Sequence, residues 1–141
     1  MKFNSTFILL MLLGQFFSLA AREVTSFNEG WLFKRGPFSE EPVKVAAQWN
    51  GKWETVNLPH TWNAKDMQVK AASFYEGVGY YKKKQFFGEG LKGKRVFLRF
   101  EGVGANTEVY VNGKLVGTHK GGYSAFAFEI GTALKLSLIH I

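Results

Sequence analysis

The dipeptide Asn112-Gly113 stands between two short segments, 107–111 and 114–119, in which apolar and polar residues alternate. Asn-Gly in this setting is the strongest short-range signal of a β-hairpin, because a two-residue type I′ turn needs positive φ at both central residues. Alternation with a period of two is typical of half-buried strands. The chain is therefore expected to be built from antiparallel strands.

Other segments show the same alternation or the aromatic and β-branched residues typical of strands. Short strands without an amphipathic helical pattern predict an all-β fold, either a β-sandwich or a jelly roll. In two of these segments, 95–101 and 125–130, every second residue is apolar and is expected to face the core. The strands expected outside the hairpin lie at 31–34, 53–58, 79–87, 95–101 and 125–130.

Residues 1–21 have the pattern of a secretory signal peptide. A basic residue lies near the start, an apolar run follows at 7–13, and small residues end the segment. A membrane anchor is the rival interpretation, but Gly14-Gln15 interrupts the run, which is short for a membrane span. We therefore expect an exported protein, secreted or periplasmic, with no membrane attachment after cleavage and with one domain at 22–135.

The charge balance limits the expected partners. The 141 residues include 18 Lys and Arg against 11 Asp and Glu, a formal charge of +7, and no cysteine, so disulfides and thiolate sites are excluded. The densest basic run, Lys82-Lys83-Lys84, has aromatic neighbours, as a nucleic-acid surface would. Alternation would send Lys82 and Lys84 to one face and Lys83 to the other, and charged residues commonly guard an exposed strand. Together with export, this argues against nucleic acid as a partner.

Catalytic and metal-binding patterns are sparse. The three histidines, His60, His119 and His140, are scattered and Asp66 is the only aspartate, so neither a metal nor another cofactor is expected. No Gly-x-Ser-x-Gly elbow is present. Glycoside hydrolysis needs two carboxylates about 5–9.5 Å apart, and no spacing of glutamates indicates such a pair. Asn28-Glu29 is interpreted as a turn, so no catalytic residue is assigned.

Aromatic side chains are the clearest candidates for contact with a ligand. Rings of Trp and Tyr stack on the apolar faces of sugars, while their polar tips form hydrogen bonds. Packing in the core of a β-sandwich is the competing interpretation, and it is expected for most of these residues. The residues concerned are Trp49, Trp53, Trp62, Tyr75, Tyr80, Tyr81 and Tyr123.

Four sequence blocks follow one another in a specific order. They read FNEGW at 27–31, LPHTWN at 58–63, YEGVGYY at 75–81 and RVFLRFEGVGANTEVYVNGKLVGTHKGGYSAFAF at 95–128. Together they resemble the N-terminal sugar-binding domain of glycoside hydrolase family 2, which contains β-galactosidases, β-glucuronidases and β-mannosidases. The likeness covers about residues 27–135.

The resemblance implies a jelly-roll β-sandwich of the galactose-binding-domain type that binds carbohydrate. In this family an immunoglobulin-like domain follows, and then a (β/α)8 barrel that carries both catalytic glutamates. The expected function is the sugar-binding N-terminal domain of an exported β-galactosidase-like hydrolase, with no catalytic residue in this chain. A free-standing carbohydrate-binding module and a purely structural adhesion sandwich are the competing hypotheses.

The resemblance also implies that loops between strands can reach the substrate. His60 is expected to be a hydrogen-bonded structural residue rather than a sugar contact. Gly121-Gly122 is expected to let two backbone segments pass closely, with Tyr123 packing or hydrogen-bonding there. The candidate substrate-binding residues are His60, Trp62, Asn63, Asp66, Tyr75 and Tyr123.

The last residues, 136–141, depart from the family pattern. After residue 135 that pattern requires a Gly-x-Asn-type turn and a further strand rich in Val and Ile, whereas this chain reads LSLIHI. We therefore expect a fragment that lacks the last strand of the sandwich, with a tail that could still form a strand. An open sheet edge predicts that the isolated chain is marginally stable or prone to aggregation.

Overall fold

The structure is a computed structural model that describes residues 22–36, 44, 52–63, 75–134 and 139–140. The signal peptide expected at 1–21, Trp49, Asp66 and most of the tail lie outside the described residues. Every strand pair is antiparallel, which confirms the expected all-β fold. The strands are β1 (Trp31–Gly36), β2 (Glu54–Val56), β3 (Val78–Lys82), β4 (Lys84–Gln85), β5 (Phe97–Phe100), β6 (Asn106–Val111), β7 (Lys114–Lys120), β8 (Phe126–Glu129) and β9 (Ile139–His140), with short 3₁₀ helices η2 (Glu89–Leu91) and η3 (Gly131–Ala133).

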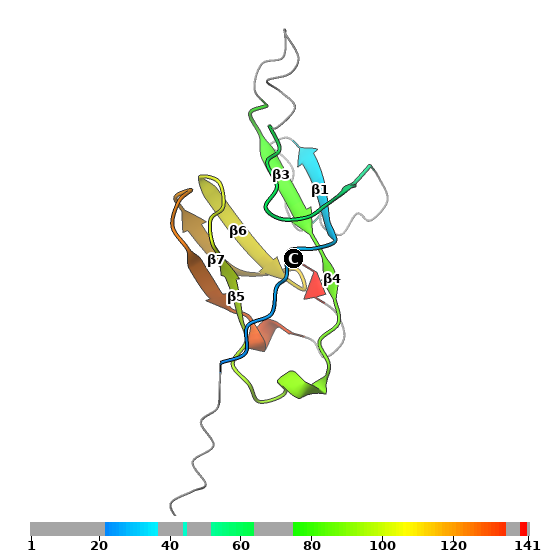
Figure 1. The fold of residues 1–141 in the computed structure, drawn as a ribbon, viewed down its shortest axis with the longest axis vertical. Helices are drawn as coiled ribbons and strands as arrows, with labels where there is room; N and C mark the ends of the chain where they lie inside the picture. The colour runs from blue at the N-terminus through cyan, green and yellow to red at the C-terminus, as the bar shows by residue number, and fades with distance from the viewer. Residues whose placement is uncertain (1–21, 37–43, 45–51, 64–74, 135–138, 141) are drawn as a thin grey trace, which may run out of the picture.

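The strands form one three-stranded sheet, in the order β2-β1-β3, and three two-stranded pairs, β4-β9, β5-β8 and β6-β7. Figure 1 shows the β1 and β3 ribbons apart from the group that contains β5, β6 and β7. We call these two regions the β1 sheet and the β6 group, the latter comprising β5 to β8. Within the described ranges, no helix combines the length and the apolar character that a membrane crossing requires.

The hairpin expected at Asn112-Gly113 is confirmed. These two residues have φ values of 51° and 78°, as a type I′ turn requires. The register next to the turn pairs Val111 with Lys114, and a bulge between Val109 and Tyr110 shifts the pairing further along. A bulge leaves one residue of a strand without a partner, and this increases the local twist of the ribbon.

The segment 79–87, expected to be one strand, is divided into β3 and β4. The pairing of β3 with β1 ends at Lys82, opposite Leu32. Beyond Lys83 the chain pairs with a different strand, β9, over two residues. The change of partner explains the break, and it shows that part of the tail does form a strand.

The apolar core consists of two clusters. In the β1 sheet, Trp31, Phe33 and Val56 are buried. In the β6 group, Val111 and Ile130 are buried, and half-buried aliphatic residues from β5 and its surroundings pack against them. The ring centroids of Phe27 and Phe87, which belong to different clusters, are 6.2 Å apart and link the two.

Two expectations about exposure are wrong. Lys82 does not guard an exposed strand, because its side chain is only 1% exposed and its Nζ lies 3.7 Å from the centroid of the Trp53 ring. Tyr123 does not pack near Gly121-Gly122, because it is fully exposed. The close backbone approach itself is confirmed, since a Cβ on Gly102 would lie 3.3 Å from the Gly122 carbonyl oxygen.

Candidate functional site

The site begins with the alternation of residues along β1. Phe33 and Arg35 project from one face of this strand, and Phe33 pairs with Tyr81 of β3. The centroids of these two rings are 4.8 Å apart. Because neighbouring strands place paired residues on the same face, the register of the sheet fixes one wall of the site.

The turn after β2 brings His60 back over this wall. The Leu58 N–H donates to the Asn28 carbonyl at 2.8 Å, which holds the turn against the start of the domain. The His60 ring lies 4.7 Å from the Phe33 ring, centroid to centroid, and His60 Nδ1 is 2.9 Å from the Tyr81 hydroxyl oxygen. Burial raises the pKa of Tyr81 above its ordinary value, so this phenol stays protonated and can act as the donor in this hydrogen bond. The hydrogen-bonded structural role expected for His60 is therefore present.

Trp62 is held from three sides. The Arg35 guanidinium donates to the Trp62 carbonyl oxygen, and the Tyr75 ring meets the indole edge to face at 6.5 Å. A Cβ placed on Gly79 would lie 2.1 Å from the indole ring, so this position can hold only glycine while Trp62 keeps its place. Tyr75 is itself fixed by donating to the Gly36 carbonyl at 2.7 Å.

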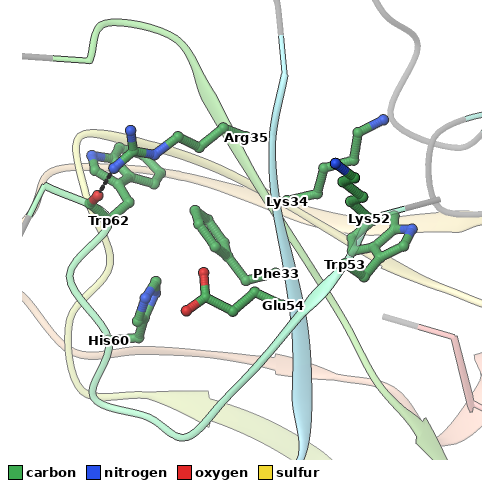
Figure 2. Close-up of a pocket in the computed structure, with 8 residues that line it drawn as sticks. All are labelled: Phe33, Lys34, Arg35, Lys52, Trp53, Glu54, His60 and Trp62. Atoms are coloured by element: carbon green, nitrogen blue, oxygen red, sulfur yellow. Dashed lines mark hydrogen bonds between the residues drawn. The ribbon is translucent and has the colours of Figure 1, made fainter. Parts of the chain in front are cut away.

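These side chains border a hollow of about 470 Å³. Figure 2 shows Phe33 between Trp62 and His60, with the Glu54 carboxylate beside it. Among the described residues that line the hollow, Glu54 is the single carboxylate, whereas glycoside hydrolysis needs two. The lining consists of Phe33, Lys34, Arg35, Lys52, Trp53, Glu54, His60 and Trp62.

The arrangement suits the binding of a polar ring compound. Aromatic faces provide apolar contact, while the imidazole, guanidinium and carboxylate groups donate and accept hydrogen bonds. The neighbouring Asn63 has a buried Oδ1 for which the described part of the chain supplies no donor.

The structure brings together some of the sequence-predicted site residues and separates others. His60 and Trp62 line the hollow, and Asn63 follows Trp62 in the chain. Tyr75 packs edge to face against the Trp62 ring. Tyr123 belongs to the β6 group, where it is fully exposed. Asp66 lies outside the described residues.

Sequence reasoning missed the parts of the site that only strand register reveals. Arg35 and Glu54 were not candidates, although Arg35 lies two residues after Phe33 and thus on the same face of β1. Glu54 is placed beside Phe33 by their pairing across β1 and β2. No sequence motif marks Arg35 or Glu54. Predicting the alternation along β1 and which residues pair across β1 and β2 would have placed both on the side of Phe33.

No group of three or more potential metal-ligating side chains occurs among the residues that the structure describes.

The antiparallel strands and the aromatic, hydrogen-bonding hollow define an all-β domain of the carbohydrate-binding class. More specifically, the chain belongs to glycosyl hydrolases family 2, sugar binding domain, whose family model matches residues 16–136. The family resemblance noted in the sequence is thereby confirmed.

The chain is similar to parts of much longer curated proteins. It is 40% identical over 134 residues to a β-glucuronidase of Bacteroides fragilis, which covers 93% of this chain and 17% of that protein. It is 36% identical over 117 residues to a β-galactosidase of Thermoanaerobacter pseudethanolicus, which covers 81% of this chain and 15% of the relative.

Solved structures give the same result for the fold. A candidate β-galactosidase from Bacteroides fragilis superposes with a TM-score of 0.72 at 70% identity, covering 84% of this chain and 18% of that one. A Bacteroides uniformis β-glucuronidase superposes with a TM-score of 0.69 at 32% identity, covering 82% of this chain and 14% of the other. These neighbours support a β-sandwich.

Proposed function

We propose that this chain is the sugar-binding N-terminal domain of an exported β-galactosidase- or β-glucuronidase-like hydrolase, and that it has no catalytic activity of its own. The observation that carries the proposal is the hollow beside β1, which offers aromatic faces and hydrogen-bonding groups but one carboxylate among its described lining residues. Such a hollow can hold and orient a sugar without cleaving the glycosidic bond. The residues proposed to bind the sugar are Trp62 and His60, which line the hollow, with Asn63 directly after them in the chain. His60 would use the imidazole nitrogen that does not contact Tyr81.

The proposal includes the rest of the parent protein. An immunoglobulin-like domain and a (β/α)8 barrel would follow in the same polypeptide, and the barrel would supply the two catalytic glutamates. Support comes from the relatives, of which this chain spans only 17% and 15%. Residues 1–21 would direct export and be removed. Amino-terminal sequencing of the protein secreted by a bacterial host tests this, and an intact Met1 on the exported protein would contradict it.

The direct test is to read the gene beyond codon 135 and to express the longer product. The longer protein is expected to hydrolyse a nitrophenyl β-galactoside or β-glucuronide, whereas the 141-residue chain is expected to show no turnover. Turnover by the short chain alone would contradict the proposal. A reading frame that continues without a barrel would contradict it as well.

The role of the hollow is tested in the longer protein by His60→Gln and Asn63→Ala. His60→Gln removes the imidazole ring and Asn63→Ala removes the amide, so KM is expected to rise by about threefold to tenfold. Thr118→Ala, on the exposed side of β7, is the matched control and is expected to leave KM unchanged. Unchanged KM in both hollow variants would exclude the hollow from substrate binding.

A further inference from the structure

The face of the β1 sheet opposite Phe33 carries a concentration of lysines. Lys82 pairs with Leu32, so Lys34 is its diagonal neighbour on the same face, within reach of a long side chain. Lys84 follows two residues after Lys82, close enough for its charge to act on Lys82. We call this set, with Trp53 and the adjacent Lys52, the lysine–tryptophan face.

Trp53 is the centre of this face. The Lys82 Nζ lies 3.7 Å from its ring centroid, a distance at which an ammonium group is attracted to the π-electrons of indole. Because the Lys82 side chain is 1% exposed, this contact is sheltered from water and fixes the ring. Burial, and then the charges of Lys84 and Lys34, lower the pKa of Lys82 to about 8. Positive charge is therefore crowded around one aromatic ring.

The hollow is lined from both sides of β1 and therefore includes part of this face. Lys34, Lys52 and Trp53 belong to its lining, and Figure 2 shows all three on one side of β1, with Arg35 and Trp62 on the other. Lys52 is exposed and Lys34 half-buried, so both ammonium groups can meet a ligand. The described lining holds Lys34, Arg35 and Lys52 against one carboxylate, Glu54. Its formal charge favours an anion.

We propose that the lysine–tryptophan face binds an acidic saccharide, with Lys34 and Lys52 contacting its carboxylate or sulfate groups and Trp53 contacting a sugar ring. The inference rests on the proposed sugar-binding function and specifies the class of sugar. A neutral sugar could accept hydrogen bonds from the two ammonium groups but would not neutralise their charge. A single-stranded nucleic acid would need successive exposed stacking rings along a basic groove, whereas among the described residues of this face Trp53 is accompanied by Tyr80, which is buried.

The test measures binding of the 141-residue chain by calorimetry at low salt. The probes are tetragalacturonate, the neutral galactotetraose of equal length, a sulfated galactotetraose and a short polyglutamate peptide. Lys34→Gln combined with Lys52→Gln is expected to weaken tetragalacturonate binding about tenfold. The matched control combines Lys114→Gln with Lys120→Gln, two exposed lysines of β7. It removes the same charge elsewhere and is expected to change binding less than twofold.

Each outcome has a defined meaning. Binding of either acidic saccharide that depends on Lys34 and Lys52 supports the proposal, and the two probes distinguish carboxylate from sulfate as the recognised group. Equal losses in the control variant, or equally tight binding of polyglutamate, would overturn it, because either result indicates general charge attraction or an acidic protein partner. Preference for galactotetraose would also overturn it while leaving the proposed sugar-binding function intact.

A spectroscopic measurement on the unaltered chain gives an independent test. Tetragalacturonate is expected to shift the indole N–H resonance of Trp53 and to leave that of Trp31, which is buried in the first core cluster, in place. Trp53→Phe assigns the signal. Binding without any change at Trp53 would overturn the proposal even if a lysine variant failed to fold.

Discussion

The two regions of the molecule use different side chains to exclude water. The β1 sheet is packed with rings that also carry polar tips: Trp31 Nε1 donates to the Phe27 carbonyl at 2.7 Å, and the Tyr81 hydroxyl meets His60. In the β6 group the buried side chains of the core cluster are aliphatic, Val111 and Ile130, and its stacked rings, such as Phe100 and Phe126, are only half-buried. There a backbone hydrogen bond, from the Ile130 N–H to the Val96 carbonyl at 2.8 Å, holds the buried Ile130.

This difference separates recognition from support. Rings with polar tips have one orientation in which every hydrogen bond is made, so they present fixed groups to a hollow. Aliphatic side chains fill space without directing any polar group. The β1 sheet is thus suited to binding, and the β6 group to stabilising the hairpin and the strands around it.

The largest expected effect is on the core of the β1 sheet. Trp31→Ala should lower the free energy of unfolding by about 3–5 kcal/mol, because it leaves a large cavity and removes the bond to Phe27. Val111→Ala, the equivalent change in the β6 group, should cost about 2 kcal/mol, since it removes two carbon atoms. Urea denaturation followed by circular dichroism measures both. Equal losses of unfolding free energy in the two variants would contradict the expected difference between the core of the β1 sheet and that of the β6 group.

Glycine substitutions probe one tight contact in each region. A Cβ on Gly79 would lie 2.1 Å from the Trp62 ring, and one on Gly117 would lie 2.3 Å from the Phe128 ring. Gly79→Ala and Gly117→Ala should each cost about 1–3 kcal/mol. The first alone should also weaken sugar binding, because Trp62 borders the hollow. Gly88→Ala is the control, with no atom within 4 Å of the added carbon. Weaker binding in Gly117→Ala would contradict the division of roles.

Stability should depend on pH through Lys82. Burial lowers the pKa of Lys82 from 10.5 to about 8, so the unfolded chain binds more protons between these values and stability must rise with pH. The wild-type chain should gain about 2 kcal/mol relative to Lys82→Met between about pH 7 and 9.5. Parallel urea titrations of the two proteins measure this difference. A difference that stays constant over the range would show that Lys82 keeps its ordinary pKa.

The smallest effect is expected at the Arg95–Glu129 ion pair of the β6 group, with 2.9 Å between Arg95 Nη2 and Glu129 Oε2 and both side chains exposed. Arg95 holds the pKa of Glu129 below its ordinary value of 4.5, so the stabilisation is present above that pH and is lost as pH falls through the lowered value. Glu129→Gln should slightly reduce this acid sensitivity in a thermal melt. A large change in stability at neutral pH would contradict the weak contribution expected of an exposed pair.

The sequence was most informative where a structure depends on local interactions. Asn112-Gly113 predicted the hairpin because few residue pairs adopt positive φ at both turn positions. Alternation in 95–101 and 125–130 correctly placed Leu98 and Ile130 toward the core. The motif blocks indicated the family, and the comparisons confirmed it.

The sequence was least informative where a property depends on partners far along the chain. Lys82 belongs to a basic run of the kind expected at a protein surface, yet pairing with β1 and the approach of Trp53 bury it. Tyr123 lies in a specific motif, yet no neighbouring segment covers it. Burial depends on which surfaces meet, and a local pattern does not encode that.

The sequence by itself determined that the chain forms antiparallel strands, where its tightest turn lies and which family it belongs to, because strand periodicity, turn geometry and motifs are short-range properties. The tertiary structure alone decided that Arg35, Glu54, His60 and Trp62 border one hollow and that lysines converge on Trp53. These groups come from separate segments, and only strand register and the packing between segments bring them within contact distance.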